Sequence, residues 1–340
     1  MTEYPFPKID LHLHLDGSFR TKTMFELAQE RGIELPGGTL ESYEEYMIEH
    51  ANAESVNDYL QMFDWPSAVL QDRDSLIRIT KELIEDLAEK GVRYAEIRFA
   101  PQLHTRKGMS QADAIEAVLE GRRQGLEENP GIDINIINCM MSFGPETLNW
   151  DANMETVEVT KDYFSDDGVV ALDLAGFEDS VPMSEYAELF VSPRKKGMNL
   201  TIHAGDNGIP QNCATVIEYG AKRIGHGHHC YYDAEIARLV VNTKTALEIC
   251  LTSNIQCKTE PSYVKHPAKN LLDMGAVVTL NTDNMILSDI TIEDEYDHAL
   301  NECGFTWNDL ITCNINSFRS SFMKEEDKAP YIEKLKTFYR

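Results

Sequence analysis

Short apolar runs rich in Ile, Leu and Val recur along the chain, and stretches of helical periodicity separate them. Apolar runs of this length are typical of buried strands. Regular alternation of strand and helix predicts a parallel sheet, and eight such units predict closure into a barrel. The first expected strand begins at Ile9, and the others cover 91–99, 132–141, 169–176, 199–203, 222–226, 245–249 and 276–283.

One stretch interrupts this alternation. Residues 41–72 follow the first predicted helix and look like a helical insertion before the second strand. Within it, Val56, Tyr59, Leu60 and Phe63 fall on one helical face at i, i+3, i+4 and i+7. An amphipathic helix packed on the body of the protein would show this pattern. A lid over a site on the first strand would show it too.

Three further helical segments, 291–303, 307–318 and 325–338, follow the last predicted strand. The predicted fold class is therefore α/β: a (β/α)8 TIM barrel with a helical lid inserted after the first strand and extra C-terminal helices. Barrels of this kind commonly exceed about 200 residues as one unit. We therefore expect residues 1–340 to form a single domain.

Composition narrows the range of partners. The net charge of −26 disfavours nucleic acid and an anionic membrane surface. The sequence contains no apolar run long enough to span a bilayer. Its seven cysteines are odd in number and scattered without a C-x-x-C motif. This usage is typical of reduced thiols, so we expect a cytoplasmic protein, and its oligomeric state stays open.

The first predicted strand ends in two histidines, His12 and His14. Residues i and i+2 of a strand point to the same face, so both imidazoles aim in one direction at the C-terminal end of the strand. Converging imidazoles suit a divalent transition metal. Two hydrogen-bonded core histidines would give the same H-x-H pattern, so the motif alone leaves both interpretations open.

Other polar residues also fall at the C-terminal ends of the predicted strands, where barrels build their active sites. Each of them alone could be a cap or a core residue, but their recurrence at the same end of successive strands makes coincidence improbable. Three histidines and an aspartate would suit zinc or another divalent metal and leave a position for water. The residues at these ends are His12, His14, Asp16, Gly176, His203, Asp206, His226, Asp283 and Asn284.

These residues lie in motifs that resemble those of the adenosine deaminases of the amidohydrolase superfamily. The motifs occur in the family's order with similar spacing and cover nearly the whole chain. The resemblance implies metal-dependent hydrolytic deamination of adenosine or 2′-deoxyadenosine, with one metal ion, usually zinc, and a small-molecule purine nucleoside as the partner. The motifs are His12-Leu13-His14-Leu15-Asp16-Gly17, Asp173-Leu174-Ala175-Gly176, Thr201-Ile202-His203-Ala204-Gly205, Arg223-Ile224-Gly225-His226-Gly227, Leu251-Thr252-Ser253-Asn254 and Asn281-Thr282-Asp283.

The resemblance also implies roles for individual residues. His226 would be the base that helps to deprotonate metal-bound water, and Asp206 would be the acid that protonates purine N1. The backbone N–H of Gly176 would bind purine N3, and Asp16 with His14 would hold the ribose 5′-hydroxyl. The metal ligands would be His12, His14, His203 and Asp283, the residue near purine N7 would be Asn284, and the apolar lid would be Tyr59, Leu60 and Phe63.

Several positions depart from the family pattern. Asp206 stands where the family has Glu, which removes one methylene and ~1.5 Å of reach from the acid. Asn284 stands where many members have a second Asp, a change that purine N7 tolerates because an amide N–H donates to it. Phe177 stands where an acidic residue is usual. His228 and His229 are extra imidazoles that we interpret as loop residues, with a second metal site as the alternative.

Two other functions stay open from the sequence. The same chemistry could act on free adenine or on another modified 6-aminopurine, because Asp206, Phe177 and Tyr59 could reflect a different pocket. A nonenzymatic descendant could instead bind purine nucleosides with negligible turnover. The ligand set favours an enzyme, since a protein that only binds has no need of His226.

Overall fold

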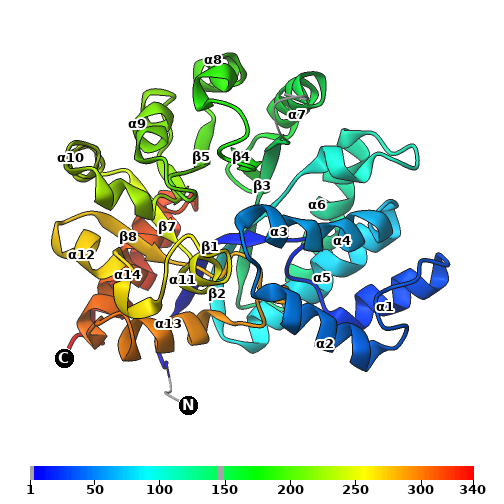
Figure 1. The fold of residues 1–340 in the computed structure, drawn as a ribbon, viewed down its shortest axis with the longest axis horizontal. Helices are drawn as coiled ribbons and strands as arrows, with labels where there is room; N and C mark the ends of the chain where they lie inside the picture. Colours follow the sequence, from blue (N-terminus) through cyan, green and yellow to red (C-terminus); the bar gives the residue numbers. More distant parts are fainter. Residues whose placement is uncertain (1–3, 144–148) are drawn as a thin grey trace.

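The computed structural model describes residues 4–143 and 149–340 and shows a barrel of parallel strands surrounded by helices (Figure 1). Eight strands pair in sequence order, each with the next one along the chain. This arrangement confirms the predicted (β/α)8 TIM barrel. The strands are β1 (Lys8–His14), β2 (Val92–Phe99), β3 (Asp133–Ser142), β4 (Val169–Gly176), β5 (Asn199–Ala204), β6 (Arg223–His226), β7 (Ala246–Ile249) and β8 (Val277–Leu280).

Helices cover the outer face of the barrel, and side chains fill its interior, so the strands are buried on both faces. Burial on both faces explains why the strands read as apolar runs and not as an alternating pattern. Most predicted helices lie within a few residues of observed ones. The helices around the barrel are α1 (Thr21–Glu30), α5 (Arg73–Glu89), α6 (Gln111–Glu128), α7 (Trp150–Tyr163), α8 (Ala187–Lys196), α9 (Pro210–Glu218), α10 (Ala234–Thr243), α12 (Ala268–Asp273), α13 (Ile292–Asn301), α14 (Trp307–Ser320) and α15 (Glu325–Lys336).

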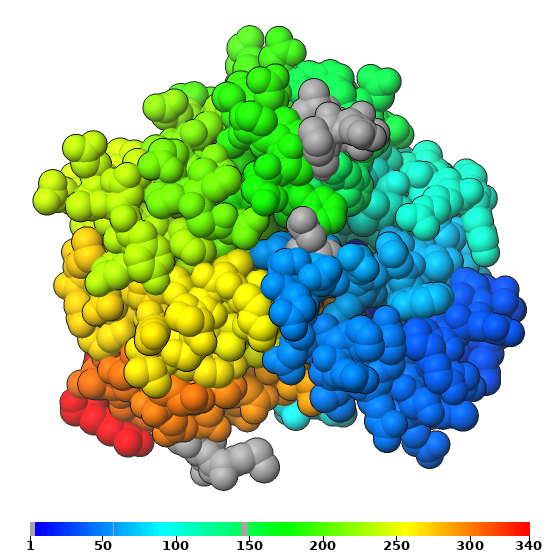
Figure 2. Space-filling view, viewed as in Figure 1, coloured from blue at the N-terminus to red at the C-terminus, as the bar shows by residue number. Residues whose placement is uncertain are grey.

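The insertion after the first strand–helix unit is helical, as the sequence predicts, but it is divided into short pieces. These are α2 (Leu40–Ala51), α3 (Val56–Leu60), the 3-10 turn η1 (Gln61–Phe63) and α4 (Asp64–Val69). Ser55 begins α3, since its hydroxyl accepts the backbone N–H of Asp58. Figure 2 shows this insertion (blue) beside the segment near residue 250 (yellow) on one face of the molecule.

A short helix that the sequence analysis did not anticipate follows β7. It is α11 (Leu251–Gln256), and six residues are too few to show a helical period. The backbone N–H groups of Leu251 and Thr252 donate to the buried carboxyl group of Glu295 on α13 at 2.8 and 2.9 Å. Glu295 therefore fixes the start of α11 and, through it, the position of Asn254 at the end of the barrel.

The barrel closes where β1 meets the chain just after β8. The His14 N–H donates to the carbonyl oxygen of Asp283 at 2.7 Å, and the Asp283 N–H donates to the carbonyl oxygen of His12 at 2.8 Å. Closure thus places the first and last polar strand ends side by side, although they are far apart in the sequence.

Two expectations from composition can be compared with the fold. All seven cysteines are buried free thiols, as the sequence predicts. Within residues 4–143 and 149–340, none of the helices is long and apolar enough to cross a membrane.

Candidate active site

His12 stands near the end of β1 with its side chain fully buried. Its Nδ1 lies 2.8 Å from Oε2 of Glu248 on β7. Because the carboxylate accepts the Nδ1 proton, the imidazole keeps a lone pair on Nε2. That Nε2 has no hydrogen-bond partner among the described residues. A buried imidazole oriented by a carboxylate in this way is typical of a metal ligand.

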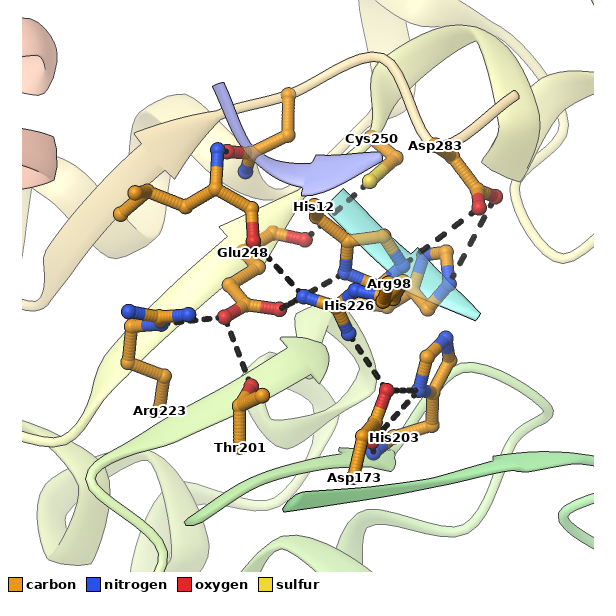
Figure 3. Close-up of polar contacts among 12 residues, drawn as sticks. His12, Arg98, Asp173, Thr201, His203, Arg223, His226, Glu248, Cys250 and Asp283 are labelled. Atoms are coloured by element: carbon orange, nitrogen blue, oxygen red, sulfur yellow. Dashed lines mark hydrogen bonds and ion pairs between the residues drawn. The ribbon is translucent and has the colours of Figure 1, made fainter. Parts of the chain in front are cut away.

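His203 on β5 is oriented in the same manner. Its Nδ1 lies 3.1 Å from Oδ1 of Asp173 on β4, and its backbone N–H donates to the same oxygen at 3.2 Å. Burial alone would raise the pKa of Asp173, but the neighbouring His203 and Arg98 hold that pKa below its usual range. The ionised carboxylate therefore fixes the ring of His203 with its Nε2 side toward the other histidines (Figure 3).

Asp283 brings a carboxylate to the two histidines of β1. Its backbone is left-handed (φ 64°), which turns the chain sharply after β8. Oδ1 lies 3.5 Å from Nε2 of His12 (Figure 3). The same oxygen lies 3.4 Å from Nε2 of His14. Both imidazoles of the H-x-H motif therefore face one carboxylate, in line with the same-face argument from the sequence.

The donors at this end of the barrel fit a divalent metal. His12, His203 and His226 each offer a ring nitrogen, and these atoms lie within 4.8 Å of one another. With Asp283 and the unpartnered Nε2 of His12, the set is of the kind that binds zinc. Cys250 also lies within this distance of His12 and Asp283. Burial raises the pKa of its thiol well above the usual value, and the thiol donates to the carbonyl oxygen of Glu248 at 3.5 Å.

Buried charges support these imidazoles from inside the barrel. Arg98 donates to Asp173 and to Glu248, both at 2.7 Å, and Arg223 donates to Glu248 at 2.5 Å. All four side chains are fully buried. Removing one partner would leave an uncompensated charge, which typically costs ~3–5 kcal/mol. The network therefore holds the two imidazoles rigidly.

Sequence reasoning did not assign these supporting residues. A signal was present for two of them, because Asp173 and Glu248 are single charged residues inside otherwise apolar predicted strands. Charges in such positions are almost never buried without partners. A search for single charges inside apolar strands would have found both.

His226 lies at the end of β6 beside the histidines and is 3 % exposed. Its Nε2 is 4.0 Å from Oδ2 of Asp283, and its Nδ1 is 3.1 Å from the amide nitrogen of Asn254. Burial lowers the pKa of His226 to about 4. The imidazole is therefore neutral at physiological pH and can exchange a proton through Nε2.

Asp206 follows β5 and reaches toward His226. The amide of Asn254 donates to its Oδ1 at 2.8 Å, the hydroxyl of Thr259 donates to the same oxygen at 3.4 Å, and Nδ1 of His226 lies 3.7 Å away. The oxygen of the Asn254 amide accepts from His266 at 3.1 Å, which fixes the amide orientation. Asn254, which the sequence analysis gave no role, thus joins Asp206 to His226.

Glu178 holds the loop that carries Asp206, and sequence reasoning missed it. Its carboxylate accepts the backbone N–H groups of Gly205, Asp206 and Asn207 and the side-chain amide of Asn212, with donor–acceptor distances between 2.5 and 2.9 Å. Burial raises the pKa of Glu178, although these donors oppose the shift. Such a contact depends on backbone groups, so no spacing in the sequence announces it.

A cavity of about 270 Å³ opens onto the histidines. Its lining includes His14, His203, His226 and Asp283 together with the lid residues. The ring of Phe63 lies edge-on to His14 with centroids 6.5 Å apart. Mostly apolar cavities with a few converging polar groups are typical of small-molecule sites. The predicted residues that line it are His14, Asp16, Tyr59, Leu60, Phe63, Gly176, His203, Asp206, His226, Asp283 and Asn284, together with Phe177.

Three predicted substrate contacts have distinct surroundings in this cavity. Gly176 has φ 104°, and a Cβ there would lie 2.5 Å from the carbonyl oxygen of Ser142, so only glycine fits. Burial raises the pKa of Asp16 to about 6. The amide oxygen of Asn284 is buried without a hydrogen-bond partner in the described part of the chain. This oxygen packs against Gly17, where a Cβ would lie only 1.8 Å from it, so glycine is required there.

Comparisons with known proteins agree with this geometry. The family model described as adenosine deaminase matches residues 7–338. The adenosine deaminase of Haemophilus ducreyi is 36% identical over 333 residues, which is 97% of this chain and 96% of that protein. Among solved structures, the adenine deaminase of Arthrobacter aurescens is 24% identical with a TM-score of 0.88 and covers 97% of this chain and 98% of its own. The Arabidopsis N6-mAMP deaminase is 26% identical with a TM-score of 0.84, and the match covers 98% of each chain.

Proposed function

The chain belongs to the adenosine deaminase family and is a hydrolase that acts on C–N bonds. From this premise we propose that it hydrolyses the 6-amino group of adenosine or 2′-deoxyadenosine, which gives inosine or 2′-deoxyinosine and ammonia. The observation that carries the proposal is Nε2 of His12, which has no hydrogen-bond partner among residues 4–143 and 149–340. The His12 imidazole clusters with His203 and His226, and these two histidines line a mostly apolar cavity together with Asp206.

The proposed metal ligands are His12, His14, His203 and Asp283. Three of them are supported by the contacts described above, and His14 faces Asp283 from the same strand as His12. A divalent metal, for which we propose one zinc ion at this site, lowers the pKa of water to around 7 and so supplies hydroxide at neutral pH. Glu248 and Asp173 hold the rings of His12 and His203 for that role.

The proposed proton carriers are His226 and Asp206. To act as a base, His226 must have its lone pair on Nε2 and its proton on Nδ1, where Oδ1 of Asp206 lies 3.7 Å away. Asn254 donates to Nδ1 in the neutral tautomer that carries its hydrogen on Nε2, so a proton on Nδ1 replaces that contact. A proton that Nε2 then accepts makes the ring an imidazolium, which can return this proton later in the reaction.

Asp206 is proposed to protonate purine N1 as the nucleophile adds to C6, since this addition moves the electron pair of the C6–N1 bond onto N1; ammonia leaves afterwards. Asn254 and Thr259 both donate to Oδ1, so Oδ2 is the oxygen that would carry the proton to the ring. Those contacts and the hold of Glu178 on the backbone support an acid built around the shorter Asp side chain. We therefore propose that the pocket is adapted to the shorter side chain of Asp206. The alternative is a slow enzyme in which this side chain is too short to reach purine N1.

The remaining contacts are proposed from the cavity lining. The backbone N–H of Gly176 would donate to purine N3, and Asn284 would contact N7. Asp16 with His14 would hold the ribose 5′-hydroxyl. Tyr59, Leu60 and Phe63 would cover the nucleoside, and the Tyr59 hydroxyl is already tied to Ser288 at 2.7 Å. We further propose a cytoplasmic location, which the seven free thiols support.

The decisive experiment compares purine substrates on one metal-analysed sample. Loss of ultraviolet absorbance is followed with adenosine, 2′-deoxyadenosine, adenine and N6-methyladenosine. We expect the two unmodified nucleosides to have the highest kcat/KM. Preference for adenine or for the N6-methyl compound would replace the substrate assignment, and Phe177 in the cavity wall would then be the first position to examine. Nucleoside binding without turnover by metal-loaded protein would overturn the enzymatic proposal.

A further inference from the structure

A second group of donors lies in the loop after β6, outside the set assigned to the first metal. It consists of His228 and His229 on the 3-10 turn η4 (His228–Tyr232) and Glu260 after α11, and we name it the loop cluster. One donor atom of each of the three residues lies within 4.8 Å of the others. The side chain of His228 is fully buried, and Glu260 is 2 % exposed.

His228 is the unusual member of the loop cluster. Neither of its ring nitrogens has a hydrogen-bond partner in the described part of the chain. Nε2 lies 3.7 Å from Oε1 of Glu260, and Nδ1 lies 3.8 Å from Oδ1 of Asp206. Both distances are too long for a hydrogen bond. A core histidine normally satisfies at least one nitrogen, so simple packing does not explain this side chain.

The other two members are held in the manner of metal ligands. Nδ1 of His229 lies 3.3 Å from the carbonyl oxygen of Gly205, which orients the ring and leaves Nε2 available. The hydroxyl of Tyr232 donates to both oxygens of Glu260 at 2.9 and 3.0 Å. A third imidazole, His266, contacts His228 but is not available, since its nitrogens bond the Asn254 amide and the Ala268 N–H, both at 3.1 Å.

We propose that His228, His229 and Glu260 bind a second divalent metal ion of the zinc type. Two imidazoles and one carboxylate are a set that zinc accepts, with a fourth position left for water. Neighbouring ligands on tetrahedral zinc lie ~3.3 Å apart when each bond is ~2.0–2.1 Å. The 3.7 Å between His228 and Glu260 therefore needs only a small inward shift. The half-buried His229 and the exposed Tyr232 provide the approach from solvent.

This second site shares no ligand with the first, but its His228 lies next to Asp206, the proposed acid of the deaminase site. The imidazole of His228 lies between Glu260 and Asp206, so a metal on its Nε2 fixes the proton on Nδ1, facing the Asp206 carboxylate. Asp206 and His228 are also two of the positions at which this sequence departs from the family pattern. The structure brings both departures into one contact.

The test is a count of metal ions per full-length chain. Protein stripped with a chelator is titrated with Zn²⁺ alone, and bound zinc is measured after desalting. We expect two equivalents for the unsubstituted chain and one for Glu260→Gln or His229→Gln. Asp283→Ala, which alters only the first site, should also retain one. The matched control is His298→Gln, which removes an imidazole bonded to Glu302 at 2.6 Å on an exposed helix face and should leave two equivalents.

The outcomes separate this proposal from the proposed function. One equivalent that Asp283→Ala removes and Glu260→Gln leaves in place would overturn the second site while the first stands. One equivalent with the opposite pattern would support the loop cluster and contradict the metal assignment of the deaminase site. If the loop-cluster variants do not fold, as judged by circular dichroism, zinc binding by Asp283→Ala decides alone: no equivalent bound would overturn the proposal.

Discussion

The two sides of the candidate active site are built differently. On the metal side, His12 and His203 stand on strands, and each is held from behind by a buried carboxylate of the barrel interior. On the acid side, Asp206 stands on a loop, and its position depends on Glu178 and on the side chain of Asn254. The sheet fixes the first side through its register, whereas individual hydrogen bonds fix the second.

This difference indicates where the site tolerates change. Three kinds of contact fix the imidazoles of the metal side: strand pairing, the carboxylates behind the rings and the arginines that hold those carboxylates. Loss of a metal ligand there should therefore lower kcat strongly, and it should do so through loss of the bound metal. The acid side has fewer supports, so substitutions there should alter turnover in graded steps and leave the metal bound. The predictions below test this contrast, from the largest expected effect to the smallest.

Asp283→Ala should break the metal side. It removes a carboxylate that lies 3.4–3.5 Å from two imidazoles, so we expect loss of the first metal equivalent and a fall in kcat of more than ~100-fold. Metal analysis and the adenosine assay measure both effects. Asp289→Asn is the matched control, because Asp289 also follows β8 with a left-handed backbone but is exposed. Full metal content with normal turnover in Asp283→Ala would remove Asp283 from the ligand set.

Asp206→Asn should break the acid side alone. An amide can hydrogen-bond to purine N1 but cannot protonate it, so we expect kcat to fall by at least ~100-fold with metal content unchanged. Steady-state kinetics with metal analysis on the same sample checks this. A kcat within about threefold of the parent would exclude Asp206 as the acid.

Asp206→Glu addresses the fit of the acid. If the surroundings are adapted to Asp, the extra methylene displaces the carboxylate from Asn254 and Thr259, and kcat should fall by about 10-fold or more. Purine riboside affinity, measured in parallel, reports whether the pocket is still intact. A rise in kcat on adenosine would instead show that the Asp206 side chain of the parent enzyme is too short to reach purine N1.

Glu178→Gln should weaken the acid side more mildly. A Gln side chain cannot accept all four donors that Glu178 binds, so the loop loosens, and we expect kcat to fall by up to ~10-fold, the low end of the range for a supporting contact, with KM and metal content little changed. The neighbouring Asp179→Asn is the exposed control. Because Glu178 would act through Asp206, its effect on kcat should largely vanish in the Asp206→Asn background. Equal effects in both backgrounds would show a general structural role.

Glu295→Gln should give the smallest effect, on the pH dependence of stability. Burial raises the pKa of Glu295 to about 8 from an ordinary value of 4.5. Between these values the folded state holds a proton that the unfolded state has lost, so the free energy of unfolding falls as pH rises through that window. We expect the variant to remove a slope of up to about 1.4 kcal/mol per pH unit. Urea unfolding at pH 6 and pH 7.5 measures the slope, and identical slopes would contradict the prediction.

The sequence predicted the barrel well because its strands are buried on both faces and therefore form separate apolar runs. The predicted strand 169–176 has the same bounds as β4 in the structure. The short α11 was missed because six residues carry no periodic signal. The insertion was predicted as helical, but its division between α3, η1 and α4 depends on packing over the barrel that a pattern of apolar residues does not encode.

The candidate site was predicted in part for the same reason. His12, His14, His203, His226 and Asp283 could be found because a barrel gathers its strand ends on one side. Their roles still rest on the resemblance and on geometry, and the experiments above test them. The supports of Asp206 could not be found in this way, since they are contacts between loops whose course only the folded chain defines.

The closure of the barrel has a consequence for how the molecule is made. His12 and His14 emerge early in synthesis, but Asp283 must be translated before it can meet them. Near the same seam, the N–H of Leu11 donates to the side chain of Asn281, 270 residues further along the chain. A metal ion bound there would tie the first strand to the last, much as a covalent cross-link does. With the proposed ligand set, the first site is therefore complete only after Asp283 has been made and the barrel has closed.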